Sequence, residues 1–156
     1  MLKWLWLSVT VIALDQASKI YIDHSFTLYQ QKQIIPGFFN LTLAYNPGAA
    51  FSLFADGDGW QRWFFTMLAV FVSGVIIFWI KGLSKHEKIT AIALSLILGG
   101  AIGNVIDRIA YGHVIDFIQF YYTQYYYPSF NIADSAITIG AAILIFHTLF
   151  GKHEQN

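Results

Sequence analysis

The sequence has 156 residues, of which 56% are hydrophobic and only 12% are charged, and its mean hydropathy is +0.53. A soluble domain carries about 25% charged residues, so this composition predicts a single integral membrane domain over residues 1–156 rather than a soluble protein. The formal net charge of zero gives no electrostatic reason to expect nucleic acid as a partner, and the absence of cysteine excludes disulfides, thiolate metal ligands and a cysteine nucleophile. The histidines form no H-E-x-x-H motif, and there is no P-loop or dinucleotide fingerprint, so we expect neither a metal nor a cofactor.

Four apolar stretches are long enough to cross a bilayer, which takes about 20 helical residues. The predicted spans lie near residues 2–22, 60–80, 89–111 and 132–150, and longer connections occupy residues 23–59 and 112–131. The first stretch has an alternative interpretation as a cleaved signal peptide, because Lys3 precedes its apolar run. We favour an uncleaved span, since the run continues past Asp15 and no clear small-residue cleavage site follows it. The predicted fold class is therefore an all-α transmembrane bundle of four helices.

The first connection contains a predicted strand at residues 39–46, between the turn signal Pro36-Gly37 and the break at Asn46-Pro47-Gly48. Its residues alternate as in a half-buried strand, with Leu41, Leu43 and Tyr45 on one side and Asn40, Thr42 and Ala44 on the other. This pattern predicts a small β-sheet in the first connection, lying on the membrane surface. The second connection is predicted to be a tyrosine-rich loop, a composition suited to the membrane interface.

The lysines predict the orientation of the chain. They gather at the beginning, between the second and third spans, and at the end, at Lys3, Lys81, Lys85, Lys88 and Lys152, whereas the two longer connections contain only Lys32. By the positive-inside tendency, both termini and the 81–88 connection are cytoplasmic, and both longer connections are external.

With this orientation, the ionisable groups of the spans, apart from the lysines at the cytoplasmic ends, fall in the outer halves of the spans, together with one amide. These residues are Asp15, Lys19, Asn104, Asp107, Arg108 and Asp134, and Asp116 lies in the second external connection itself. Ionisable groups at membrane depth are costly and usually mark a functional site. Gly99 and Gly103 have the small-xxx-small spacing that lets helices approach closely beside this polar face. We expect Asp116 and Asp134 to meet at the outer membrane face and to perform acid–base chemistry there.

Both aspartates also have structural interpretations. Asn131 is the predicted N-cap of the last helix, so Asp134 could serve only to favour the positive end of that helix dipole. Asp116 could be an ordinary surface carboxylate.

The neighbouring polar residues have structural alternatives as well. Asp107 and Arg108 are expected to belong mainly to a structural ion-pair network, and Asp15 and Lys19 have the i,i+4 spacing of a helical ion pair. Asn46 could be only a turn residue.

With these residues in hand, the sequence resembles the lipoprotein signal peptidases, the bacterial signal peptidase II family, over nearly its whole length. The resemblance rests on D-Q-A-S-K at Asp15–Lys19, N-P-G-A-A-F-S at Asn46–Ser52, G-N-x-x-D-R at Gly103–Arg108 with V-I-D-F at Val114–Phe117, and F-N-I-A-D at Phe130–Asp134. Four such runs in this order, on spans of this topology, are highly specific.

The resemblance implies a monomeric aspartyl endopeptidase of the bacterial cytoplasmic membrane, with Asp116 and Asp134 as its catalytic dyad. It implies that the enzyme removes a prolipoprotein's signal peptide immediately before a cysteine that carries diacylglycerol, with this lipid-modified substrate and membrane lipids as partners. It also implies support from Asn46, Gly48, Asn104, Arg108, Asn131, Asp15 and Lys19.

The residues alone leave two other functional classes open. A small transporter or proton relay would also gather carboxylates within a bundle, but here no chain of charged groups leads towards the cytoplasm. A purely structural membrane protein would leave the clustering of charges at the outer ends unexplained.

Overall fold

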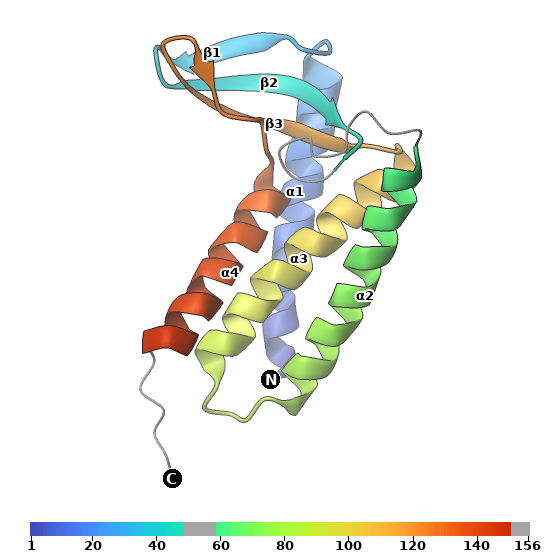
Figure 1. Cartoon of the computed structure of the whole chain (residues 1–156), viewed down its shortest axis with the longest axis vertical. Coiled ribbons are helices and arrows are strands. Elements are labelled where there is room, and N and C mark those ends of the chain that lie inside the picture. The colour runs from blue at the N-terminus through green and yellow to red at the C-terminus, as the bar shows by residue number, and fades with distance from the viewer. Residues whose placement is uncertain (49–58, 151–156) are drawn as a thin grey trace.

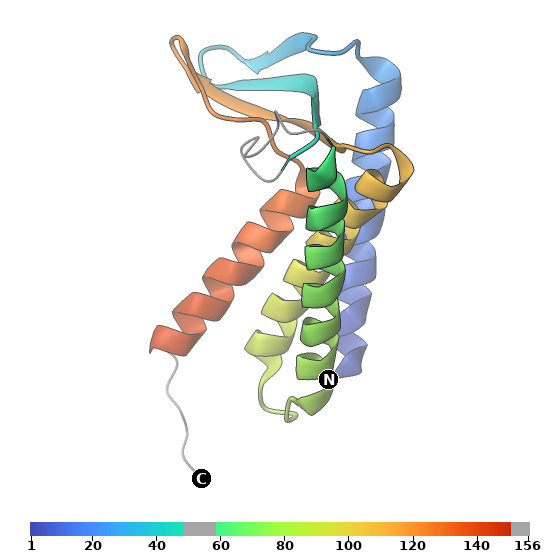
Figure 2. The same cartoon turned by 45° about the vertical axis from the view of Figure 1, so that its right-hand side comes forward.

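The helices of the computed structural model, which describes residues 1–48 and 59–150, stand side by side below a small antiparallel sheet (Figure 1, Figure 2). A 3₁₀ turn (η1, Leu2–Trp4) leads into the helix α1. The four long helices are α1 (Leu5–Ser25), α2 (Trp60–Gly82), α3 (Lys88–Ala110) and α4 (Ile132–Phe150). The strands are β1 (Gln31–Ile35), β2 (Phe39–Asn46), β3 (Val114–Tyr122) and β4 (Tyr125–Tyr126). The second half of the Asn46–Ser52 motif, from residue 49 on, and Lys152 lie outside the described residues.

Three helices of the described chain, α2, α3 and α4, are long and apolar enough to cross a membrane. α1 is of similar length, but Asp15 and Lys19 interrupt its apolar run, and it does not reach the same hydropathy. A fourth span at α1 therefore stays a prediction.

The helix α3 is the centre of the bundle, because it packs against α1, α2 and α4. The predicted close approach at Gly99 and Gly103 is confirmed on the side that faces α1. A Cβ atom added at Gly99 would lie 2.8 Å from the Cβ of Val11, and one added at Gly103 would lie 2.6 Å from Oδ2 of Asp15. Glycine at these positions therefore lets α1 approach α3 closely enough for their polar side chains to meet.

The sheet has the strand order β1-β2-β3-β4, with every neighbouring pair antiparallel. The predicted strand at residues 39–46 coincides with β2. The prediction of a sheet in the first connection holds for β1 and β2 but was incomplete, because β3 and β4 come from the second connection, in the segment predicted to be a tyrosine-rich loop. The β-branched and aromatic residues of that segment pair with β2, so that Asp116 lies opposite Ala44.

The prediction that β2 has one buried and one exposed face was also wrong. Asn40 and Thr42 are nearly as buried as Leu43, at 4%, 3% and 1% exposed. The strand lies between β1 and β3 and shifts its register between Leu41 and Ala44, so the simple alternation is not maintained. Leu43 joins a hydrophobic cluster with Ile22, Ile115 and Phe117, which connects the sheet to the end of α1.

Candidate active site

Asp116 is the third residue of β3 and is buried, with 2% of its surface exposed. The Nδ2 atom of Asn131 donates a hydrogen bond of 2.8 Å to its Oδ1 atom, and Nδ2 of Asn46 donates one of 3.2 Å to its Oδ2 atom. The interpretation of Asp116 as an ordinary surface carboxylate is therefore wrong, because pairing of β3 with β2 carries this residue into the interior.

Asp134 is the third residue of α4 and is half-buried. Asn131 caps the helix as predicted, since its Oδ1 atom accepts the Asp134 N–H at 2.9 Å. Oδ2 of Asp134 accepts the Asn131 N–H at 3.3 Å in return, which completes a reciprocal capping arrangement. Its other oxygen, Oδ1, accepts a 2.8 Å hydrogen bond from Nδ2 of Asn104. Capping thus uses one carboxylate oxygen, while the other belongs to a network that reaches α3.

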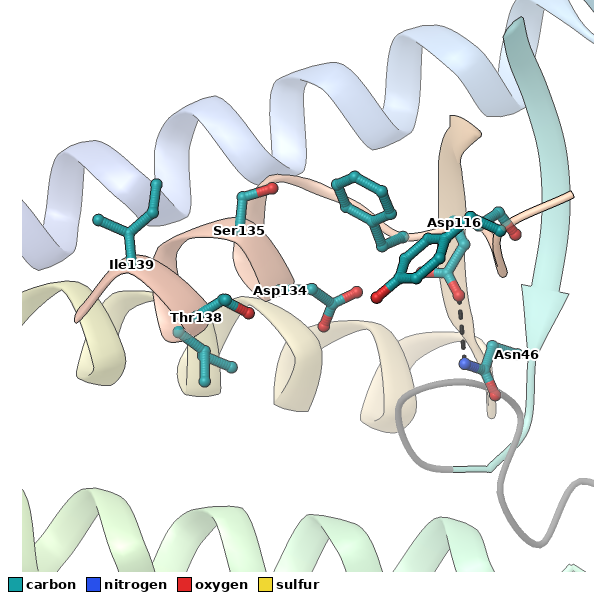
Figure 3. A pocket seen from close by; sticks show the side chains of 10 residues that line it. Asn46, Asp116, Asp134, Ser135, Thr138 and Ile139 are labelled. Carbon is teal, nitrogen blue, oxygen red and sulfur yellow. Dashed lines mark hydrogen bonds between the residues drawn. The ribbon is translucent and has the colours of Figure 1, made fainter. Parts of the chain in front are cut away.

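The two aspartates line one pocket of about 410 Å³, together with Asn46 (Figure 3). Beyond the aspartates the pocket runs along α4, past Ser135, Thr138 and Ile139. Its lining is mostly apolar as a whole, with the two carboxyl groups at one end and two hydroxyl groups, those of Ser135 and Thr138, along the helix. The remaining lining residues are Tyr127, Ser129, Phe130 and Ile137.

Burial and the negative charge of Asp134 raise the pKa of the Asp116 carboxyl from 3.8 to about 7. Burial is the larger cause, because it disfavours the charged form, and the nearby carboxylate adds to it. The hydrogen bonds from Asn46 and Asn131 oppose this rise in pKa without cancelling it. Asp116 can therefore hold a proton near neutral pH, which is what a general acid requires.

The amide of Asn104 connects the site to α1. Its Oδ1 atom accepts hydrogen bonds from Nζ of Lys19 at 3.0 Å and from Nδ2 of Asn131 at 3.3 Å. With its oxygen engaged in this way, the amide presents its nitrogen to Asp134. Asn104 and Asn131 together hold both aspartates of the pocket in fixed orientations.

Lys19 neutralises two buried carboxylates. Its Nζ atom lies 2.8 Å from Oδ2 of Asp15 and 2.8 Å from Oδ2 of Asp107, and all three residues are almost fully buried. The predicted i,i+4 pair of Asp15 and Lys19 is therefore confirmed. Oδ1 of Asp15 also accepts the Ala133 N–H at 2.9 Å, in the first turn of α4. The ion-pair network thus holds α1, α3 and α4 together.

Asp107 belongs to an ion-pair network as expected, but Arg108 makes its hydrogen bonds to main-chain carbonyls. In the described chain Asp107 pairs with Lys19, whereas Nη2 of Arg108 donates to the Gly48 carbonyl at 3.0 Å and Nη1 donates to the Asn104 carbonyl at 3.4 Å. The physical reason is that consecutive residues of a helix point in different directions and do not face each other.

Asn46 is both a turn residue and a residue that supports the site. Its Oδ1 atom accepts the Gly48 N–H at 3.0 Å, as a turn residue does, and this leaves its Nδ2 atom facing Asp116. Arg108 holds the carbonyl of the same glycine. The structure therefore brings all seven residues of the expected support set into one network around the two aspartates.

Two further residues of this network were missed from the sequence. Gln16 donates from Nε2 to Oδ1 of Asp107 at 2.8 Å, and its position inside the D-Q-A-S-K run was a signal that could have identified it. Arg62 donates from Nε to the Arg108 carbonyl at 2.7 Å and from Nη2 to the Ile109 carbonyl at 2.9 Å. It thereby binds the end of α3, and the signal was a single arginine at the start of an apolar helix.

His113 is close to Asp116 in sequence, but its ring packs against Tyr45. Its ring lies 4.0 Å from that of Tyr45, measured between centroids, and burial lowers its pKa. The Tyr45 hydroxyl donates to Asp23 at 2.7 Å, so this group connects the sheet to the end of α1.

Residues 7–150 match the family described as Signal peptidase (SPase) II. The chain is 52% identical to the lipoprotein signal peptidase of Pseudomonas putida, over 99% of this chain and 91% of that protein. It is 56% identical to that of Pseudomonas fluorescens, over 92% of this chain and 85% of that protein. Its fold is similar to a bacterial membrane enzyme solved by the in meso method at 2.3 Å resolution, with a TM-score of 0.87, 30% identity, and coverage of 99% of this chain and 93% of that one.

These comparisons decide between the functional classes that the residues left open. Nothing in them supports a transporter or proton relay, and they cover nearly the whole chain rather than one motif. The apolar helices agree with a membrane-bound protein. The chain is therefore a hydrolase, an aspartic-type peptidase that belongs to the signal peptidase II family.

Proposed function

We propose that Asp116 and Asp134 are the catalytic dyad with which this peptidase removes the signal peptide from diacylglyceryl-modified prolipoproteins, cleaving before the lipidated cysteine. The observation that carries the proposal is that both carboxyl groups line one pocket, where burial and the nearby charge of Asp134 raise the pKa of Asp116 to about 7. The names of the relatives, lipoprotein signal peptidases, support this substrate class.

The two carboxyl groups share one proton, because two negative charges held close together cannot both form easily. Asp116 is the more buried group, and we assign the proton to it. Asp134 is the ionised partner, since it borders the pocket, accepts hydrogen bonds from Asn104 and Asn131, and stands at the positive end of α4.

In this mechanism Asp134 takes a proton from a water molecule, which attacks the scissile carbonyl carbon. Asp116 donates its proton towards the carbonyl oxygen as negative charge develops there. The leaving amine is then protonated as the C–N bond breaks, and the pair returns to one shared proton. No covalent intermediate with the enzyme forms.

The fixed orientation of the carboxyl groups supports this chemistry. Asn131 bonds to Asp116 through its side chain and to Asp134 through its N–H, so one residue sets their relative position. Asn104, which is itself held by Lys19, bonds to the other carboxylate oxygen of Asp134. Groups positioned in advance need no reorganisation when the substrate arrives.

The proposed topology has four spans, both termini in the cytoplasm and the dyad at the outer face. It is supported by the lysines of the α2–α3 connection, which lies at the opposite end of the bundle from the sheet (Figure 1). A pocket whose lining is mostly apolar apart from the dyad suits a substrate whose acyl chains stay in the bilayer while its peptide bond reaches water. We propose that the enzyme acts as a monomer.

The test is cleavage of a purified diacylglyceryl-modified prolipoprotein by the purified protein, with the same prolipoprotein lacking the lipid as control. We expect a shortened product from the modified substrate, with the lipidated cysteine at its new N-terminus. Equal cleavage of both substrates would contradict the lipid requirement, and no cleavage of either would contradict the proposed substrate class.

A further inference from the structure

A hollow of about 570 Å³ opens at the end of the bundle opposite the dyad. It is lined by Met1, Lys3, Lys85, His86 and Lys88, and no acidic residue is among the lining residues. These residues come from the beginning of the chain, from the α2–α3 connection and from the first position of α3, three segments that lie close together in both views (Figure 1, Figure 2). We propose that this hollow binds the phosphate headgroup of an anionic phospholipid.

The positive charge of the hollow is not neutralised by the described part of the protein. The ion pairs of the described residues are those of Lys19, far from this end, and none involves Lys3, Lys85 or Lys88. The carboxylate of Glu87 in the same connection accepts the Ser84 N–H at 2.8 Å and does not line the hollow. Three ammonium groups around one space repel one another, and a bound anion would relieve this repulsion.

The location of Lys88 strengthens the case for an anion. It is the first residue of α3, where the helix dipole disfavours a cation. The positive charge of Lys88 therefore does not stabilise α3. A phosphate in the hollow would interact favourably both with this charge and with the positive end of the helix dipole.

The positive-inside tendency explains why lysines are present at this end, but not why they surround one space. Lys81 follows the tendency alone, because it lies in the last turn of α2 and outside the hollow. Lys3 is about 80 positions from Lys85 along the chain, yet both line the hollow. This convergence makes a site, and basic pockets between membrane helices are known to hold anionic headgroups.

The apolar surroundings indicate a lipid rather than free phosphate. Leu2 and Ile89, the chain neighbours of Lys3 and Lys88, are both about half exposed, at 49% and 50%. Phe78 and Trp79, near the end of α2, are exposed as well. α2 and α3 are of membrane-spanning length, so acyl chains attached to a headgroup in the hollow can lie along these side chains.

The test uses the full chain in nanodiscs of zwitterionic phosphatidylcholine, into which phosphatidylglycerol is titrated. Bound lipid is counted by native mass spectrometry, and thermal unfolding is followed in parallel. The wild type should retain phosphatidylglycerol and unfold at a higher temperature as this lipid increases. The variant combining Lys3→Gln, Lys85→Gln and Lys88→Gln should bind it on the order of 100-fold more weakly, since each lysine near an anionic headgroup contributes about fivefold.

Lys81→Gln is the matched control and should bind the lipid as the wild type does, because it removes a lysine from the same end but not from the hollow. If the triple variant does not fold, Lys85→Gln alone should still bind about fivefold more weakly. Equal loss in Lys81→Gln would reduce the effect to general surface charge and overturn the site. Inorganic phosphate that stabilises the protein and competes with the lipid at low millimolar concentration would assign the hollow to a free anion instead.

The proposal is independent of the proposed dyad. Cleavage by the triple variant in neutral lipid should equal that of the wild type, because the hollow and the dyad lie at opposite ends of the bundle (Figure 1).

Discussion

The Nζ atom of Lys19 lies 3.0 Å from Oδ1 of Asn104, and this contact determines which end of the Asn104 amide meets Asp134. A lysine can only donate, so the amide oxygen must face Lys19 and the amide nitrogen must face the carboxylate. A residue of α1 thereby orients a hydrogen bond at the beginning of α4, although it touches neither aspartate of the pocket.

Replacing Lys19 with methionine should destabilise the protein strongly. The change leaves Asp15 and Asp107 buried without their cation, and loss of one partner from a buried ion pair costs on the order of 3–5 kcal/mol. Thermal unfolding in detergent measures the effect. Lys32→Met is the control, since Lys32 is exposed on β1 and should tolerate the change. Equal unfolding temperatures for Lys19→Met and the wild type would contradict the role of Lys19.

Asp116→Asn and Asp134→Asn should each nearly abolish cleavage while expression and membrane insertion stay close to normal. Asparagine keeps the shape of aspartate but cannot ionise and therefore cannot act as a general acid or base. The double variant should be no worse than either single variant, because residues that act as one unit are not additive. Single-turnover cleavage of the lipid-modified substrate measures the loss.

Asp23→Asn is the matched control for the dyad. Asp23 is a carboxylate at the same end of the molecule that bonds to the Tyr45 hydroxyl and does not line the pocket. It should keep most of the wild-type cleavage rate. A folded Asp134→Asn protein that cleaves at the normal rate would reduce Asp134 to a residue of the helix cap.

Cleavage should show a bell-shaped dependence on pH, with the alkaline side falling as pH rises through about 7, where Asp116 loses its proton. On the acid side, cleavage falls because protonation of the second carboxyl removes the base. A rate that stays constant from pH 6 to 9 would contradict Asp116 as the group that carries the proton.

The same titration should appear in stability. The pKa of Asp116 is raised from 3.8 to about 7 in the folded protein, so at intermediate pH the folded state binds a proton that the unfolded chain has lost. The stabilisation from this group is complete below about pH 4 and is lost as pH rises through about 7. The unfolding temperature of the wild type, compared with that of Asp116→Asn, should therefore decline across this interval. A constant difference would show that Asp116 does not titrate there.

Arg108→Ala should weaken the protein by about 1–3 kcal/mol and raise the Michaelis constant, because it leaves the Gly48 carbonyl without its donor. Loss of that contact frees the turn that presents Asn46 to Asp116. Arg108→Lys should restore only part of the effect, since lysine lacks the fork that reaches both Gly48 and Asn104. Unchanged unfolding temperature and Michaelis constant in Arg108→Ala would exclude this role.

Reporter fusions after residue 84 and at the C-terminus should read cytoplasmic, and fusions near residues 57 and 124 should read external. The reason is the distribution of lysines among the connections. A cytoplasmic reading at residue 124 would place Asp116 and Asp134 on the wrong side for the proposed substrate.

Much of the fold could be predicted because apolar length and helical spacing act locally. The start of α4 at Ile132 and the cap at Asn131 follow from local rules, and both were predicted. The strand β3 was not, since pairing with β2 depends on a segment about 70 residues away in the chain. Strand formation is more dependent on context than helix formation, which is why the second connection was predicted to be a loop.

The site residues were likewise easier to identify than their partners. Sequence motifs named Asp107 and Arg108 but not their separate partners, which are Lys19 and the Gly48 carbonyl. Adjacent residues of a helix point in different directions and therefore meet different parts of the molecule. The contact between Lys19 and Asp107 joins α1 to α3 and depends on the close approach at Gly103. The spacing of small residues predicted that approach, but no local pattern shows which side chains it brings together. Arg62 was missed for the same reason, because its partners are main-chain carbonyls of another helix.

The bond from the Ala133 N–H to Asp15 has a consequence for biosynthesis, because its two residues are 118 positions apart in the chain. When α1 leaves the ribosome, Asp15 and Lys19 can already pair. Their other partners, Asp107 of α3 and the Ala133 N–H of α4, are synthesised later. A nascent chain that stops before α4 therefore carries an incompletely satisfied carboxylate inside its helices. Completion of α4 supplies the missing donor and at the same time brings Asp134 into the pocket of Asp116, so that the bundle and the site are completed in one step.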